Sequence, residues 1–543
     1  MRGFLRLPGL TGAVLIVALL IAGPIPANAY RDHHDPYNGI VPLSEIYEKL
    51  GVPYHGRHGC PSPEDFELLL ELEVNDVEET AELPAFTQVK GTLFPSIRFE
   101  LRLPSEYEWN RKFYMAGCGG FCGGVDIFPV GQFTNNLNWG LLRGYASVTM
   151  DSGHDNEGNG RTYADWALDN RAGEVDWGFR SVHETARVSK ALICAFYRER
   201  PKYSYFAGCS TGGRMAVVEA VRFPKDFDGV ISGAPALNYT GLVATWMSWA
   251  VQAVGDNVFT AADQAAIEQA VLDQCDGLDG AADGLISDPR LCPEIDFSGV
   301  FPPGDPKLDA LEKLYEQRPT NSAGDILYEG VLPYGSEIYW PIWLPGAEAT
   351  VLNPFVRNLI VPFNDGFIKY MAFEVDDPTF TAIDFNFDTD PERLDFMGRI
   401  YSATTDLDAY KKGGGKILMY HGWADTIVPP IYTQHYYDQV AAAMGGVKRI
   451  QRFFRLFMIP GMDHCSTAQD LERVGFGTSI GLDDFDALTA LEMWVERGQA
   501  PDSLEASGWT RDGSPISQVL YPYRSDEFHG KGKKGRRQGH HDE

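Results

Sequence analysis

The sequence predicts an α/β protein built on a mostly parallel β-sheet. Short apolar runs that end at Gly or Pro indicate strands, and helical patterns separate several of these runs. Because strands that alternate with helices normally lie parallel in one sheet, helices should cover both of its faces. The predicted strands are 112–116, 145–150, 203–207, 229–231, 416–420 and 453–459, and the predicted helices are 181–200, 213–222 and 483–497.

The composition is that of a large folded protein with an acidic surface. Of the 543 residues, 44% are hydrophobic and only 22% are charged, which excludes a disordered chain or a collagen-like repeat. Lys plus Arg number 46 and Asp plus Glu number 75, so the net charge is −29. A surface this acidic repels phosphate backbones, so we expect no nucleic acid partner.

Residues 1–29 have the pattern of a secretory signal peptide. Arg2 and Arg6 precede an apolar run over 13–22, and Ala27-Asn28-Ala29 provides the small residues that a signal peptidase recognises. A membrane anchor is the alternative, but the run has about half of the ~20 apolar residues that a spanning helix needs. No other apolar segment is long enough, so we expect a secreted protein without a membrane anchor.

The regular alternation of strands and helices breaks down over 237–401, a Trp-containing stretch with a Pro- and Asp-rich middle. We interpret it as a large lid domain inserted between two strands, because the sheet pattern resumes at Lys416; a second, independent domain is the alternative. The α/β domain would then comprise 30–236 and 402–528. The last residues, 529–543, are rich in Gly, Lys and Arg without apolar periodicity and predict a disordered basic tail.

The segment Gly208-Cys209-Ser210-Thr211-Gly212 fits the pattern G-x-S-x-G. It follows a predicted strand and precedes a predicted helix, which is the setting in which this pattern forms a sharp turn and exposes the serine hydroxyl. The pattern by itself is a weak signal, but this setting makes Ser210 a candidate nucleophile.

A nucleophilic serine needs a general base, and the base needs an acid that holds its tautomer. On this kind of sheet the three residues follow in the order Ser, Asp, His. Two later strands end in such residues, with Asp425 after the first and His464 after the second. Asp463 and Asp483 remain alternatives for the acid, whereas His435 lies within a helical pattern.

Cys209 precedes the candidate nucleophile, and Cys465 follows the candidate base. In a Ser–His–Asp triad Ser210 and His464 come within hydrogen-bond reach, which brings the two cysteines close to the ~5.5 Å Cα separation of a disulfide. The predicted export and the even number of cysteines favour such bonds. We therefore predict a Cys209–Cys465 disulfide that joins the two loops; two buried free thiols are the alternative.

These residues resemble the motif of the tannase and feruloyl esterase family, in which Cys-Ser, Asp and His-Cys combine the triad with the disulfide. The likeness covers about 87–501 and includes the segments 144–146, 151–154, 176–183, 222–229 and 233–236. The resemblance implies an α/β-hydrolase fold with a lid over the triad. It also implies hydrolysis of esters of aromatic acids, such as feruloyl esters of plant polysaccharide or galloyl esters of tannins, and an oxyanion hole formed by the backbone N–H groups of Thr211 and Gly120.

The segment 276–285 has three aspartates and three glycines, and Cys275 and Cys292 flank it. Hard oxygen ligands at this density suit Ca²⁺, although the spacing is not that of an EF-hand; a solvated loop is the alternative. The resemblance implies a structural calcium ion in the lid, together with a Cys275–Cys292 disulfide that closes the loop. Its implied ligands are the side chains of Asp276, Asp279 and Asp283 and the carbonyls of Ala281 and Leu285.

The chain departs from the family pattern in its other cysteines. Cys118 and Cys122 lie in the glycine loop that contains Gly120, where the family usually has no cysteine, so the shape of this loop stays open. With Cys60 and Cys194 they allow three pairings.

The sequence thus predicts a secreted serine carboxylic-ester hydrolase. Small terephthalate-like aromatic monoesters are alternative substrates. A non-catalytic secreted binding protein and a peptidase on the same fold are alternative functions, and the complete triad argues against the binding protein.

Overall fold

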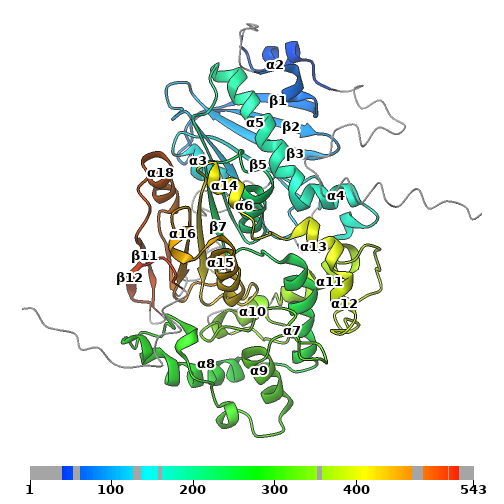
Figure 1. Cartoon of the computed structure of the whole chain (residues 1–543), viewed down its shortest axis with the longest axis vertical. Helices are drawn as coiled ribbons and strands as arrows, with labels where there is room; N and C mark the ends of the chain where they lie inside the picture. The colour runs from blue at the N-terminus through cyan, green and yellow to red at the C-terminus, as the bar shows by residue number, and fades with distance from the viewer. Residues whose placement is uncertain are drawn as a thin grey trace, which may run out of the picture.

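A computed structural model of the chain describes residues 40–52, 61–125, 136–156, 162–350, 357–466, 481–510 and 513–524. The expected signal peptide, 1–29, and the expected tail, 529–543, lie outside these residues. Within the described ranges, nine strands form one central sheet with helices on both sides (Figure 1). The predicted α/β class is therefore confirmed.

The central sheet has an antiparallel edge and a parallel body. Its strand order is β1-β2-β3-β5-β4-β6-β7-β8-β9. The pairs β1–β2, β2–β3 and β3–β5 are antiparallel, and every later pair in this order is parallel. The strands are β1 Leu69–Val77, β2 Phe86–Leu93, β3 Ile97–Pro104, β4 Lys112–Ala116, β5 Ala146–Met150, β6 Tyr203–Cys209, β7 Gly229–Gly233, β8 Lys416–Gly422 and β9 Phe454–Ile459.

The six predicted strands correspond to β4–β9, with ends that differ by one or two residues. The antiparallel strands β1–β3 were not predicted, because charged residues interrupt their apolar positions, as in the sequence LLELEVNDV of β1. A second sheet of β10 (Gly481–Asp484), β11 (Leu504–Trp509) and β12 (Pro515–Leu520) also escaped prediction. The sequence pattern therefore identified the buried body of the sheet and missed its half-exposed edge.

The helix predicted over 483–497 was placed too early. Residues 481–484 form β10, and the helix α18 runs over Ala487–Arg497, after the Asp486 side chain accepts a hydrogen bond from the Thr489 N–H. The other two predicted helices are α5 (Ser181–Tyr197) and α6 (Thr211–Arg222). The α/β part of the chain also contains one longer helix, α15 (Pro430–Met444). Its shorter helices include α2 (Leu43–Lys49), α3 (Leu137–Leu141), α4 (Arg171–Val175), α14 (Asp408–Lys412) and α16 (Val447–Ile450).

Alternating side chains of the parallel strands enter two different cores. In β4, Phe113 and Met115 belong to the large core that contains residues of α5 and α6, whereas Tyr114 belongs to the smaller core that contains Leu491 of α18. This alternation follows from the two-residue repeat of a strand. Because both faces of the parallel strands are covered, a site is expected in the loops at the carboxyl ends of these strands.

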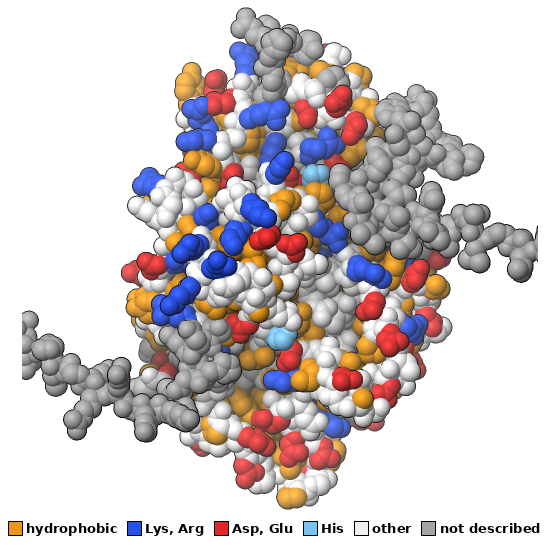
Figure 2. Space-filling model, viewed as in Figure 1, with side chains coloured by type: hydrophobic (Ala, Val, Ile, Leu, Met, Phe, Trp, Pro, Cys, Tyr) orange, Lys and Arg blue, Asp and Glu red, His pale blue; other side chains and the backbone are white. Residues whose placement is uncertain are grey.

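The chain leaves the sheet after β7 and returns to it at β8, and the two strands pair with each other. In the described part of this segment the α-helices before α14 are α7 Met247–Val254, α8 Ala261–Cys275, α9 Pro306–Glu316, α10 Trp340–Trp343, α11 Ile360–Tyr370, α12 Asp390–Arg393 and α13 Asp395–Tyr401. Helices α7–α10 lie beyond the carboxyl ends of the parallel strands, at the lower end of Figure 1. Figure 2 shows many acidic side chains over this lower end. The domain limits expected at 237 and 401 stay a prediction.

A fully buried cation joins this segment to the sheet. Arg214 of α6 donates hydrogen bonds to the carbonyls of Trp177, Gly178 and Tyr401, and its guanidinium lies 4.0 Å from the centroid of the Trp177 ring. Burial lowers the pKa of Arg214 to about 10, so the side chain is charged at neutral pH.

We expect Arg214→Met to lower the free energy of unfolding by about 3 kcal/mol or more, because the three carbonyls lose a charged donor while they stay buried. Urea unfolding of the purified protein would measure this effect. Lys412→Met is the matched control, since the Lys412 side chain is 77% exposed and its ion pair is with Asp408 of the same helix. Equal losses in the two variants would contradict the role of Arg214.

Candidate active site

Ser210 lies in a sharp turn between β6 and α6. Its φ of 63° and ψ of −122° place it in a left-handed conformation that non-glycine residues rarely adopt. The Ser210 N–H donates to the carbonyl of Gly233, and a β-carbon on Gly208 would lie 2.6 Å from the backbone of Gly212. The glycines therefore allow the close approach that this turn needs, and Ser210 stays half-buried at the end of the strand.

Asp425 and His464 meet beyond the ends of β8 and β9. The Nδ1 of His464 lies 2.7 Å from Oδ2 of Asp425, which is fully buried. The other oxygen of Asp425 accepts hydrogen bonds from the N–H groups of Ile427 and Val428. Because Nδ1 of His464 must donate to the carboxylate, Nε2 is the nitrogen that can accept a proton in the neutral ring.

Burial alone would raise the pKa of Asp425, but the charge of His464 and the hydrogen bonds from His421 and His464 outweigh it, and the pKa falls to about 2. Asp425 is therefore ionised at any pH at which the protein is expected to work. Of the two alternatives for the acid, Asp463 is the residue before His464, and Asp483 lies in strand β10.

A second histidine, which the sequence analysis missed, also contacts Asp425. Nε2 of the fully buried His421 lies 3.0 Å from Oδ2 of Asp425 and 2.9 Å from the carbonyl oxygen of Val428. Both atoms are acceptors, so Nε2 carries a proton, and Nδ1 lies 2.8 Å from the hydroxyl of Thr433 on α15. His421 thus donates to the same oxygen as His464. Its position four residues before Asp425 was the signal available in the sequence.

The Cys209–Cys465 disulfide is present, with a Cα–Cα distance of 6.0 Å. It joins residues that are 256 positions apart and links the loop of Ser210 to the loop of His464. Cys275 and Cys292 are also bonded. Cys194 is in a disulfide as well, whereas Cys60 lies outside the described residues.

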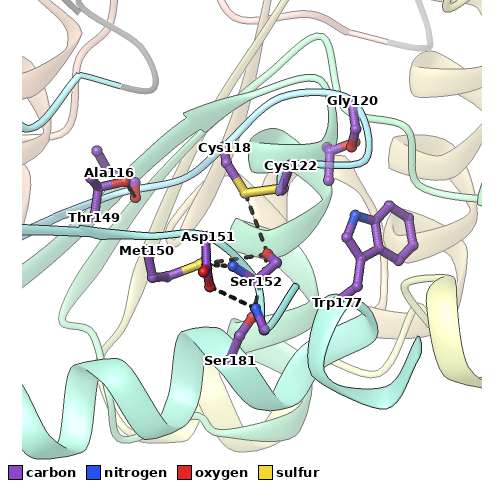
Figure 3. Close-up of a disulfide and its surroundings, with 12 residues drawn as sticks. Ala116, Cys118, Gly120, Cys122, Thr149, Met150, Asp151, Ser152, Trp177 and Ser181 are labelled. Carbon is purple, nitrogen blue, oxygen red and sulfur yellow. Dashed lines mark hydrogen bonds between the residues drawn. A yellow bond between two sulfur atoms is a disulfide. The ribbon is translucent and has the colours of Figure 1, made fainter. Parts of the chain in front are cut away.

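The two residues expected to form the oxyanion hole lie next to each other. The hydroxyl of Thr211 donates a 2.7 Å hydrogen bond to the carbonyl of Gly120, which has a left-handed φ of 58°. A disulfide between Cys118 and Cys122 encloses Gly120 (Figure 3). This bond resolves part of the pairing that the sequence left open. It shows that the extra cysteines close the loop after β4.

A tryptophan of the segment between β7 and β8 contacts the candidate base. The ring of Trp343 in α10 lies edge-on against the ring of His464, at a centroid distance of 5.4 Å and an interplanar angle of 87°. An aromatic side chain therefore stands beside the imidazole that would handle the proton.

The aspartates of the expected calcium loop bind its own backbone. Asp276 accepts hydrogen bonds from the N–H groups of Asp283 and Gly284, Asp279 accepts from Ala281, and Asp283 accepts from Leu285. Among the described residues, no Lys or Arg forms an ion pair with these three carboxylates. Burial raises the pKa of Asp276, and repulsion from Asp283 and Asp279 adds to this effect. A donor set of oxygens without a nearby cation fits a hard metal ion, but the carboxylates would have to turn toward it.

In the described ranges, one group of acidic and histidine side chains is close enough together to hold a metal ion, and it lies outside the loop 276–285. His183 of α5, Glu219 of α6 and Asp226 have ligand atoms within 4.8 Å of one another. However, the half-buried ammonium of Lys190 donates to the Asp226 carbonyl and attracts both carboxyl groups. A cation of the chain already balances this group, so we interpret it as structural.

Several known proteins that this chain resembles are named as ester hydrolases. The profile described as tannase and feruloyl esterase matches residues 81–538. A probable feruloyl esterase B-1 from Aspergillus fumigatus is 32% identical over 450 residues, which are 80% of each chain. A mono(2-hydroxyethyl) terephthalate hydrolase from Piscinibacter sakaiensis is 31% identical over 494 residues, which are 78% of this chain and 79% of that protein.

The fold is also that of a solved relative. The crystal structure of feruloyl esterase B from Aspergillus oryzae superposes with a TM-score of 0.68 at 24% identity and covers 84% of this chain and 92% of its own. The profile match spans most of the chain, and both curated relatives span nearly four fifths of it. The chain therefore belongs to the tannase and feruloyl esterase family and is a carboxylic ester hydrolase with an α/β-hydrolase fold.

Proposed function

We propose that this protein is a secreted serine esterase that cleaves esters of aromatic acids through an acyl-enzyme. Oγ of Ser210 attacks the ester carbonyl while Nε2 of His464 takes the hydroxyl proton and passes it to the leaving alcohol. Asp425 keeps the other proton of His464 on Nδ1. Water then attacks the acyl-enzyme with the same assistance and releases the acid.

The observation that carries this proposal is the disulfide-linked pair of loops that contain Ser210 and His464. The 2.7 Å contact between Asp425 and His464 holds the imidazole, and the Cys209–Cys465 bond ties that loop to the turn with Ser210. A strained serine at a strand end and an acid-held histidine on a disulfide-linked loop together supply a nucleophile and a base. A non-catalytic binding protein would have no need of this combination.

The oxyanion of the tetrahedral intermediate would be stabilised by the backbone N–H groups of Thr211 and Gly120. The hydrogen bond between Thr211 and Gly120 supports this assignment, because it keeps the two residues together. Two fixed donors in a site without water lower the barrier by several kcal/mol.

The names of the relatives point to esters of aromatic acids as substrates. Relatives are named for feruloyl and terephthalate esters, both of which present a carboxyl ester attached to a planar aromatic acid. The edge-on contact of Trp343 with His464 supports an aromatic neighbour for the scissile bond. We propose feruloyl or galloyl esters, bound to plant polysaccharide or tannin, with small terephthalate-like monoesters as the second candidate.

The test is release of ferulate, gallate, terephthalate and p-nitrophenol from their esters by the wild-type protein, with Ser210→Ala as the control. Turnover of at least one aromatic ester by the wild type alone is the expected result. Equal rates in the two proteins would contradict the esterase proposal. A panel of aromatic amides tests the peptidase alternative, which faster amide than ester cleavage would favour.

Secretion rests on two observations. The pattern of 1–29 is that of a signal peptide, and the described residues hold three complete disulfides, which are typical of oxidising compartments. Within the described ranges, we find no helix that combines the length and the apolar character needed to cross a bilayer. Detection of the protein in culture medium, with Tyr30 as its first residue, tests this part of the proposal.

We further propose that Asp276, Asp279 and Asp283, with the carbonyls of Ala281 and Leu285, bind a structural Ca²⁺. Leu285 lines the same small cavity as Ala424, the neighbour of Asp425, so the loop packs close to the triad. The ion would neutralise three carboxylates that have no other cationic partner in the described part of the chain and would hold the loop in place.

Chelation of calcium is therefore expected to lower Tm by about 3 °C or more, because an ion at 100 times its Kd contributes about 2.7 kcal/mol. Differential scanning calorimetry with EGTA and with added Ca²⁺ would measure it. Asp279→Asn should lower Tm in calcium and abolish the response to EGTA, whereas the exposed control Asp296→Asn should respond as the wild type does. The same Tm with and without calcium in the wild type would remove the metal from the proposal.

A further inference from the structure

The loop after β4 is a small ring closed by a disulfide. Cys118 and Cys122 are bonded across four positions, and the Cys122 N–H donates to the carbonyl of Gly119, so that Gly119, Gly120 and Phe121 form the tip of a tight turn. At its start the Gly117 N–H donates to the carbonyl of Ala207 in β6, the strand that leads to Ser210. The residue before the ring is therefore hydrogen-bonded to β6, the strand that leads to Ser210.

Neighbouring segments hold this ring on several sides. The hydroxyl of Thr211 contacts the carbonyl of Gly120, and the Asn156 side chain donates a 2.6 Å hydrogen bond to the carbonyl of Cys122. Sγ of Cys118 lies 3.4 Å from the hydroxyl of Ser152 (Figure 3). Phe121 is fully buried, and its ring packs 5.6 Å from the ring of Phe363 in α11. These contacts attach the ring to its neighbouring segments, whereas the disulfide restricts the backbone conformation within the ring.

The ring also has a strained backbone. Gly120 and Cys122 both have left-handed φ values, 58° and 62°. Glycine adopts such a φ at no steric cost, but a residue with a β-carbon does so only when its surroundings hold it. Without the disulfide, a loop this rich in glycine would have many other conformations available. Residue 122 would then no longer be held at its left-handed φ.

We propose that the Cys118–Cys122 disulfide is a positioning element of the oxyanion hole, which holds the N–H of Gly120 in the place that the developing oxyanion requires. This proposal rests on the serine esterase function proposed above. Both sulfurs are buried, with 3% and 1% of the cysteine residues exposed, so the bond acts as a permanent brace. Its contribution should appear in the transition state, where the oxyanion exists, and hardly at all in the binding of the ester.

The test compares the wild type with the double variants C118A/C122A and C118A/C122G. Removal of one oxyanion donor costs about 10²–10³-fold in kcat, so a loosened donor should cost about 10–100-fold, with KM changed less than about threefold. Phenylboronic acid, whose adduct with Ser210 places an oxygen in the oxyanion hole, should bind more weakly by a similar factor. Benzoate, a ground-state ligand of the same size, should bind within about threefold of wild type.

The glycine variant separates positioning from backbone strain. Glycine accepts the φ of 62° freely, so this variant should fold even where C118A/C122A does not, yet it lacks the brace. Ser189→Ala, a buried substitution in α5 outside the ring, is the control and should leave the ratio of the phenylboronic acid and benzoate affinities at its wild-type value.

Four outcomes would overturn the proposal. A wild type that hydrolyses no ester removes the proposed function and this inference together. An active wild type whose variants keep kcat and boronic acid affinity within about threefold removes only the inference. Recovery of wild-type kcat in C118A/C122G, or failure of both variants to fold, would make the bond a purely structural one.

Discussion

Ser210→Ala is expected to lower kcat for ester hydrolysis by about 10⁴-fold or more, with the fold unchanged. The hydroxyl of Ser210 is the atom that would form the acyl-enzyme, and alanine has no group that can replace it. Activity that remains would come from the oxyanion hole and substrate binding alone. Steady-state kinetics with a p-nitrophenyl ester gives the magnitude, and intact-protein mass spectrometry should detect the acylated wild type and no adduct on the variant.

Ser189→Ala is the matched control for this variant. Ser189 is fully buried in α5, and its hydroxyl has no hydrogen-bond partner among the residues that the structure describes. The control should keep wild-type kcat, because the change removes a serine hydroxyl that the proposed reaction does not use. If Ser210→Ala retained more than about one tenth of the wild-type rate, Ser210 could not be the nucleophile.

Asp425→Asn is expected to lower kcat by about 10⁴-fold, although the two side chains have the same shape. Oδ2 accepts from the ring nitrogens of His464 and His421, and Oδ1 accepts from two backbone N–H groups, so four donors converge on the carboxylate. Asparagine has one oxygen and one NH₂ group, and either orientation turns its NH₂ toward donors. When it faces His464, the imidazole must move its proton to Nε2 and can no longer take the proton of Ser210.

The same substitution has a pH signature. The pKa of Asp425 is about 2, below its value in an unfolded chain, so its ionised form stabilises the folded protein above about pH 4, and this contribution disappears as the pH falls toward 2. Asp425→Asn should therefore destabilise the protein at pH 7 by about 2–3 kcal/mol, and the difference should shrink below pH 4. Urea unfolding between pH 7 and pH 3 would measure this dependence. A difference that grows on acidification would contradict it.

Asp463→Asn provides the comparison that assigns the acid, because Asp463 is next to His464 and is also buried. It should retain kcat within about tenfold of wild type. If Asp463→Asn lost activity and Asp425→Asn kept it, the roles of the two aspartates would have to be exchanged.

The parts of the molecule that sequence reasoning predicted depend on contacts between neighbours in the chain. The turn at Ser210 needs only a strand, two glycines and a helix in succession, so the local pattern contains all of its requirements. The buried strands β4–β9 are apolar on both faces, which makes them visible as continuous runs. Strand β1 escaped because it lies at the sheet edge, where one face meets water and the sequence alternates with charges.

The histidine pair shows where such reasoning stops. His421 contacts Asp425 because the chain after β8 turns back, and because Thr433 of α15 holds its other nitrogen. In the sequence it is a histidine at the end of a buried strand, and burial alone would explain it. The spacing of four residues between His421 and Asp425 does not by itself distinguish a packed imidazole from one that donates to the candidate acid.

By itself, the sequence determined the fold class, through the alternation of strands and helices, and the family, through short patterns at the ends of strands. The same patterns gave the proposed order of nucleophile, acid and base. It also predicted two disulfides that the structure contains, Cys275–Cys292 from the family resemblance and Cys209–Cys465 because two loops that meet bring their neighbouring cysteines together. Only the tertiary structure decided that Cys118 bonds Cys122 around Gly120 and that two imidazoles share one oxygen of Asp425. The sequence left the partner of Cys118 open among three other cysteines. The meeting of the two imidazoles at Asp425 depends on the pairing of β8 with β9, which a linear pattern does not record.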